Sequence, residues 1–117
     1  MMNQRQKIMD IIANAQGTEQ YHRFPPLEIT DGVLALAEVG GCFWFLSIIA
    51  SYQHDKRLCR EFQVWKLEVD LETRSAIVHG YNDDVEIIVQ EVERTDFPLA
   101  ELKLFLIRGV ILLPKEY

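Results

Sequence analysis

The chain has 117 residues, of which 49% are hydrophobic and 26% charged, and its formal net charge is −6. This length fits a single domain spanning residues 1–117, and the composition is that of a globular protein rather than a disordered one. Two cysteines are too few for a disulfide framework and no secretory signal is visible, so we expect a cytoplasmic protein.

The negative charge is concentrated in the second half of the chain. Residues 61–101 contain eleven acids and three bases, whereas residues 1–60 contain six of each. Acidic surface repels phosphate, so we expect no nucleic-acid partner. The apolar run at residues 33–50 approaches the length of a membrane span, but the Gly40-Gly41 pair divides it into two buried helices, and we expect no membrane role.

The first predicted elements are a helix and a loop. Apolar side chains recur at helical spacing near the N-terminus, which predicts an amphipathic helix that ends near Gly17. The residues with this spacing are Ile8, Ile11, Ile12 and Ala15. Pro25 and Pro26 forbid continuation of a helix, so residues 17–27 are expected to form an ordered loop.

Two further helices are predicted before the middle of the chain. Thr30 and Asp31 are good N-cap residues for a short helix that Gly40 or Gly41 can close. Residues 43–53 then form a helix with apolar side chains on nearly every side, which is typical of a central helix.

The hydrophobic spacing changes from helical to alternating after the basic run at residues 56–60, which we interpret as a solvated linker. The alternation predicts strands over residues 64–71, 76–81 and 85–93. Because the connections are short, these strands are expected to form an antiparallel meander.

The last predicted elements are a helix and a short strand. Pro98 suits the first turn of a helix that Gly109 closes, and four apolar residues form its inward stripe. These residues are Leu99, Leu102, Phe105 and Leu106. Residues 110–113 predict a strand that ends before the next proline. The predicted fold is therefore α+β, with three N-terminal helices, a three-stranded antiparallel meander, one further helix and a short C-terminal strand.

Several segments together resemble a family of small bacterial and phage-associated proteins known only as a domain of unknown function. They are Gly17–Tyr21, Thr30–Val33, Trp44, Ala50–Gln53, Phe62–Trp65, Thr95–Leu99 and Leu112–Tyr117. The resemblance covers most of the chain from Gly17 onwards. It implies no activity, cofactor or partner.

The candidate catalytic residues are Glu19, His22 and Asp31, and Tyr21 lies among them. A carboxylate beside an imidazole can set its tautomer and raise its basicity, as a general base requires, and a tyrosine can donate to a developing oxyanion. The alternative interpretation is structural. In it, Glu19 caps backbone donors, His22 is exposed and Asp31 caps the helix that follows.

The candidate binding residues are Tyr21, Trp44 and Trp65, because aromatic side chains often line pockets. The two tryptophans lie in apolar periodic segments, where core packing accounts for them equally well. The three histidines are far apart and have no metal-ligand spacing, and there is no phosphate-binding glycine loop, so we expect neither a metal nor a cofactor.

Two hypotheses for the function remain open. The first is a small soluble non-enzymatic module that binds a ligand or a protein, with either a second copy of itself or an unidentified protein as partner; a homodimer would bury a sheet edge or an aromatic patch. The second is a small enzyme that uses the acid and base groups of the loop at residues 17–31.

Overall fold

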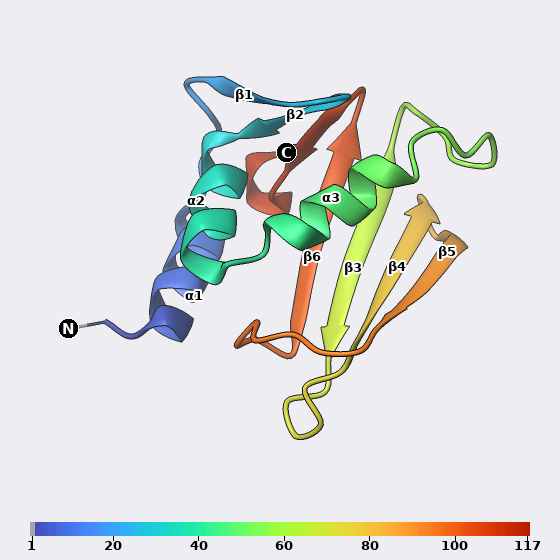
Figure 1. Cartoon of the computed structure of the whole chain (residues 1–117). Coiled ribbons are helices and arrows are strands. Elements are labelled where there is room, and N and C mark those ends of the chain that lie inside the picture. The colour runs from blue at the N-terminus through green and yellow to red at the C-terminus, as the bar shows by residue number, and fades with distance from the viewer. Residues whose placement is uncertain (1) are drawn as a thin grey trace.

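The computed structural model describes residues 2–117, in which helices pack against a seven-stranded sheet (Figure 1). The helices are α1 (Gln4–Asn14), α2 (Asp31–Gly40), α3 (Phe43–Ser51) and the short 3-10 helix η1 (Pro114–Glu116). The strands are β1 (Tyr21–Phe24), β2 (Leu27–Thr30), β3 (Gln63–Val69), β4 (Ala76–Asn82), β5 (Val85–Val92), β6 (Glu101–Ile107) and β7 (Val110–Leu112).

The sheet has the strand order β1-β2-β7-β6-β3-β4-β5. All neighbouring strands are antiparallel except β2 and β7, which are parallel. The sheet is thus built from an N-terminal hairpin, a C-terminal hairpin and the β3–β4–β5 meander. The short parallel contact between β2 and β7 joins the N-terminal hairpin to the rest of the sheet.

Local capping signals fix the ends of the first two helices. Asn3 caps α1, where its side chain accepts a hydrogen bond from the Gln6 backbone at 2.8 Å and forms a capping box. Thr30 caps α2, where its Oγ1 accepts a hydrogen bond from the Val33 backbone at 3.2 Å. Gly41 ends α2 in the left-handed conformation, with a φ of 61°.

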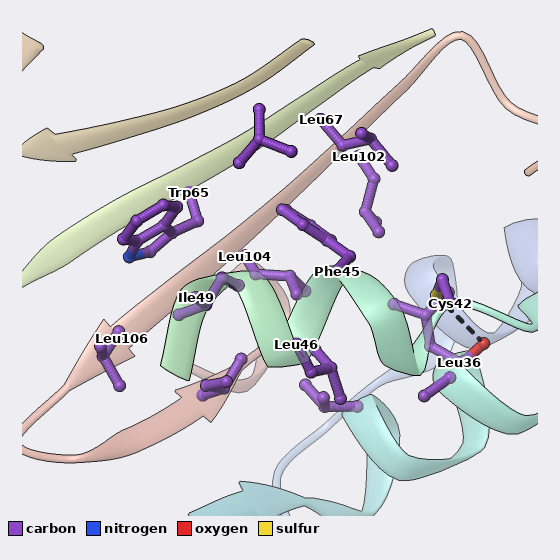
Figure 2. Packing of buried hydrophobic residues seen from close by; sticks show 14 of the residues in the cluster. Leu36, Cys42, Phe45, Leu46, Ile49, Trp65, Leu67, Leu102, Leu104 and Leu106 are labelled. Atoms are coloured by element: carbon purple, nitrogen blue, oxygen red, sulfur yellow. Dashed lines mark hydrogen bonds between the residues drawn. The ribbon is translucent and has the colours of Figure 1, made fainter. Parts of the chain in front are cut away.

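The core lies between α3 and the sheet, and α3 crosses the face of β3 and β6 (Figure 1). Figure 2 shows Phe45 and Ile49 on the side of α3 that faces Trp65, Leu67 and Leu104 of the sheet. All five side chains have a relative exposure of 0%. Burial of each such side chain contributes about 1.5–3 kcal/mol, so this contact between helix and sheet is a main source of stability.

The α+β class is confirmed, but the predicted arrangement differs in detail. The strands predicted in the meander are present as β3, β4 and β5, yet they belong to a sheet of seven strands rather than forming a sheet of their own. No helix within residues 2–117 combines the length and apolar character that a membrane crossing needs.

The helix predicted after Pro98 is wrong, because residues 101–107 form strand β6. Leu102, Leu104 and Leu106 are buried, and the intervening side chains face the other side, which is the alternation of a strand. Pairing with β3 from Glu68↔Glu101 to Gln63↔Leu106 supplies the backbone hydrogen bonds that a helix would have made internally. Gly109 does not end a helix; it completes the two-residue turn between β6 and β7 at a φ of 85°.

The loop predicted at residues 17–27 contains part of a hairpin. Residues 21–24 form β1, which pairs antiparallel with β2 across the turn at Pro25-Pro26. The prolines prevent a helix here, as predicted. The segment is a strand rather than a loop because β1 pairs with β2, and β2 is in turn paired with β7. A four-residue segment becomes a strand only where such partners are available, and its own sequence does not show them.

Candidate functional site

His22 and Asp31 lie close together where the first hairpin meets α2. His22 is the second residue of β1, and Asp31 is the first residue of α2. The pairing of β1 with β2 brings the two side chains together, and His22 Nε2 lies 2.6 Å from Asp31 Oδ1. The structure therefore places two of the three candidate catalytic residues within hydrogen-bond reach.

Asp31 also holds the backbone of the preceding loop. Its Oδ2 accepts hydrogen bonds from the backbone N–H groups of Glu19 at 2.9 Å and Gln20 at 3.4 Å, and its own N–H donates to Thr18 Oγ1 at 2.8 Å. The hydrogen bond with His22, followed by those from this loop, lowers the pKa of Asp31 from 3.8 to about 2. The ionised carboxylate thus fastens the loop to the first turn of α2.

Glu19 and Tyr21 do not join this pair. The side chain of Glu19 is exposed and forms no hydrogen bond with the residues that the structure describes. Tyr21 precedes His22 in β1, so the two side chains point to opposite faces of the sheet. The Tyr21 ring is 59% exposed and lines a separate hollow of about 360 Å³ that includes Thr30 and Glu116. Tyr21 therefore cannot serve as the oxyanion donor for a reaction at His22.

The two tryptophans have different environments. Trp65 has a relative exposure of 0%; its ring stacks on Tyr52 at a centroid distance of 6.0 Å, and its Nε1 donates to Gln63 Oε1 at 2.8 Å. A ligand has no access to this ring. Trp44 is half-buried, packs against Phe45 at 6.1 Å, and lines a hollow of about 530 Å³ next to Arg94.

A larger cleft, of about 650 Å³, lies where the C-terminal end of α3 meets the turns of the two hairpins. We call it the end cleft; its lining residues are Pro26, Leu27, Ala50, Gln53, His54, Arg60, Glu61, Leu106, Arg108 and Gly109. Leu27 and Leu106 are 7% and 2% exposed, and they form an apolar floor with Ala50. The remaining side chains form a polar rim.

Two arginines stand together on this rim. The backbone N–H of Arg108 donates to the backbone carbonyl of Arg60 at 3.2 Å, which fixes the spacing of the two chain segments. Arg108 Nε donates to Glu61 Oε2 at 3.0 Å, and these side chains are 79% and 72% exposed. The rim thus carries two guanidinium groups and one carboxylate, with the imidazole of His54 beside them.

Hydrogen bonds connect the wall of the end cleft to the core. Gln53 Nε2 donates to Ile49 O at 2.9 Å, and the side-chain amides of Gln53 and Gln63 form reciprocal hydrogen bonds at 3.0 and 2.9 Å. Gln63 is fully buried and also accepts the indole hydrogen bond of Trp65. These bonds satisfy the buried amides and hold the Gln53 side of the cleft in one conformation.

The sequence did not identify the end cleft. Its lining comes from the first hairpin turn, the end of α3 with the linker after it, and the second hairpin turn, which are distant in the chain. The charged pattern of the linker that contains Arg60 indicates only a solvated segment. The sequence offers one signal, a glycine at position 109, which can take the positive φ that a two-residue hairpin turn needs, but this signal is useful only if residues 101–107 are first recognised as a strand.

A third polar cluster lies on the sheet face opposite α3. His79 Nδ1 is 2.6 Å from Glu86 Oε1, and His79 Nε2 is 3.0 Å from Glu68 Oε1, although the second contact is not aligned as a hydrogen bond. The Tyr81 ring stacks beside the imidazole at 6.2 Å. The two carboxylates approach different nitrogens of the ring, so they do not converge on a point. Within residues 2–117, no group of three or more His, Cys, Asp and Glu side chains is arranged to hold a metal ion.

A protein family model matches nearly the whole chain. The match is to the family of unknown function DUF6876, and it extends over residues 6–117. This agrees with the resemblance that the sequence segments indicated. No curated protein and no solved structure matches the chain.

Proposed function

The chain belongs to this family of unknown function, and we propose that the chain is a small non-enzymatic binding module. Its ligand would occupy the end cleft. The observation that carries the proposal is the cleft itself. Its volume of about 650 Å³ lies within the range of about 300–1,000 Å³ that small-ligand sites occupy. An apolar floor with a few polar groups at the rim is the usual composition of such sites.

The end cleft can bind without large rearrangement. Leu27 lies in β2 and Leu106 in β6, so two strands of the sheet hold the floor. Ala50 is in α3, and the amide hydrogen bonds between Gln53 and Gln63 fix the adjoining wall. A site on rigid elements loses little conformational entropy when a ligand enters, and that favours binding.

The alternative occupant of a binding module is a second copy of the chain, paired along an edge of the sheet. The edge strand β5 exposes Val85 and Val89, which are 58% and 59% exposed. The same strand carries Glu86 and Glu91, and two copies paired along this edge would bring their acidic side chains together. Charged residues on an edge strand act against such pairing, so the end cleft is the better supported binding surface.

One observation favours the enzyme hypothesis. The distance of 2.6 Å between His22 Nε2 and Asp31 Oδ1 is that of a base and the group that orients it. Catalysis also needs a cavity where a substrate can reach the other ring nitrogen. Neither residue lines the end cleft, and Asp31 is engaged with the loop backbone. The hydrogen bonds of His22 and Asp31 are explained by their structural role of holding the loop against α2, so the enzyme hypothesis is the less well supported of the two.

The binding proposal can be tested with a neutral apolar probe. We expect 2-(1-naphthyl)ethanol, titrated into the ¹⁵N-labelled chain, to shift amide resonances around Leu27, Ala50 and Leu106. Ala50→Trp would place an indole in the cleft and abolish these shifts. Ala13→Trp, at an exposed position of α1, is the matched control and would retain them. If Ala50→Trp loses its fold, Ala50→Leu serves as the milder filling variant. Shifts scattered over the surface, or unchanged in the filled variant, would remove the proposal.

A further inference from the structure

The two arginines of the end cleft have free donor groups, unlike Arg57 and Arg74. Arg57 forms three side-chain hydrogen bonds with Asp55, and Arg74 donates to two backbone carbonyls. Arg60, in contrast, forms no side-chain hydrogen bond or ion pair with the residues that the structure describes. Arg108 uses only its Nε, so within the same residues both of its terminal nitrogens have no partner.

The balance of charge at the end cleft is opposite to that of the chain. The whole chain has a net charge of −6, yet the cleft rim holds two guanidinium groups and a single carboxylate. A positively charged site on an acidic protein directs anionic ligands to itself, because the rest of the surface repels them.

The C-terminal end of α3 opposes this attraction only in part. A helix C-terminus carries the equivalent of about half a negative charge on its free carbonyl groups. Here, Ser51 Oγ donates to Ile48 O at 2.7 Å, Gln53 Nε2 donates to Ile49 O at 2.9 Å, and Gln53 N donates to Ala50 O at 3.2 Å. The carbonyl groups nearest the cleft are therefore already satisfied, and the net single positive charge of the two arginines and Glu61 exceeds the partial negative charge of the helix end.

We infer that the ligand of the end cleft is a small apolar carboxylic acid, whose carboxylate binds Arg60 and Arg108 while its apolar body covers the floor at Leu27, Ala50 and Leu106. This inference rests on the proposed binding function. Glu61 shows how a carboxylate sits on Arg108, since its Oε2 accepts from Nε at 3.0 Å. The terminal nitrogens that Glu61 leaves free are donors of the kind that bind a second carboxylate with two parallel hydrogen bonds.

Glu61 allows a test whose direction distinguishes acid binding from a purely structural role of the arginines. Its carboxylate competes with the ligand for Arg108 and repels an anion in the cleft. Glu61→Gln would therefore strengthen binding of an acid, whereas loss of either arginine would weaken it. Arg108 has a φ of 48°, so Arg108→Asn is the suitable replacement, because asparagine tolerates the left-handed conformation. Arg60→Gln removes the other charge.

The test compares 1-naphthylacetate with 2-(1-naphthyl)ethanol, which have the same aromatic ring and differ in charge. Both are titrated into the full chain by NMR at neutral pH and low salt, in a buffer without carboxylate or phosphate. We expect the acid to bind roughly tenfold more tightly than the alcohol, because a hydrogen bond between charged groups contributes about the free energy that corresponds to a tenfold change in affinity. The advantage would fall as salt is raised, because salt screens exposed charges.

The variants separate the two levels of the proposal. Arg60→Gln and Arg108→Asn together would remove the advantage of the acid over the alcohol when both are measured in that double variant, while Glu61→Gln would increase this advantage. If neither compound shifts the cleft resonances, the binding function itself fails. If both bind there equally, or if the acid keeps its advantage without the two arginines, the carboxylate inference is overturned although the cleft still binds.

Discussion

Replacement of Gly80 by alanine tests whether the position of the Trp65 ring is set by close packing against β4. The new Cβ would lie 2.7, 2.8 and 3.0 Å from Cη2, Cζ3 and Cζ2 of Trp65. Carbon atoms in contact are normally about 3.5–4.0 Å apart, so the ring would have to move by roughly 0.8 Å. The ring is 0% exposed, is held by Gln63 at 2.8 Å, and stacks on Tyr52 at 6.0 Å.

The magnitude follows from two opposing effects. Overpacking of a well-packed core costs about 1–3 kcal/mol. Alanine lowers the entropy of the unfolded chain and returns about 0.4–1 kcal/mol. We therefore expect Gly80→Ala to lower the free energy of unfolding by about 1–2 kcal/mol, and Tm by about 4–10 °C. Urea and thermal unfolding followed by far-ultraviolet circular dichroism measure both quantities.

A double-mutant cycle with Trp65→Phe provides the control. Phenylalanine lacks the part of the indole ring that the new methyl group would strike. In the Trp65→Phe background, Gly80→Ala is expected to be neutral or slightly stabilising, with a coupling energy of about 1–3 kcal/mol. An equal cost of Gly80→Ala in both backgrounds, or no cost in the native one, would refute the packing argument.

Two further predictions concern titratable groups. The pKa of Asp31 is lowered from 3.8 to about 2, so its carboxylate stabilises the fold above pH 3.8 and loses this effect as the pH falls towards 2. The difference in unfolding free energy between the native chain and Asp31→Asn, measured by urea unfolding at a series of pH values, should shrink across that window; a constant difference would contradict the assignment. Cys42 is 1% exposed and its burial raises its pKa to about 12, whereas Cys59 is exposed. Iodoacetamide at about pH 8 should then label only Cys59 in the folded chain and both cysteines in urea, and labelling of Cys42 without urea would argue against its burial.

Local sequence signals were sufficient for the first helices and the meander. Caps such as Thr30 and terminators such as Gly41 act within a few residues, so they are visible in the sequence. The alternation that begins near Trp65 belongs to strands whose neighbours follow directly in the chain. In these regions the contacts that decide the structure are short in sequence, and the pattern and the fold agree.

The segment from Pro98 to Gly109 had two compatible patterns. Leu102, Phe105 and Leu106 fit a helical stripe, and Leu102, Leu104 and Leu106 fit a strand. The pattern alone does not choose between them. The choice depends on the free edge of β3, which offers β6 a hydrogen-bonding partner more than thirty residues away in the chain. A partner at that separation is a property of the fold, not of the segment.

The candidate catalytic residues also depend partly on local sequence and partly on tertiary structure. The sequence grouped Glu19, His22 and Asp31, but the hairpin pairing decided that His22 reaches Asp31 while Glu19 contributes only its backbone.

The sequence by itself thus determined the α+β class, the cap and terminator of α2 and the alternation of the meander strands, because these depend on neighbours along the chain. Only the tertiary structure decided the sheet order and the end cleft, since Ala50, Arg60 and Arg108 belong to a helix, a linker and a hairpin turn that only the packing of α3 on the paired strands brings together.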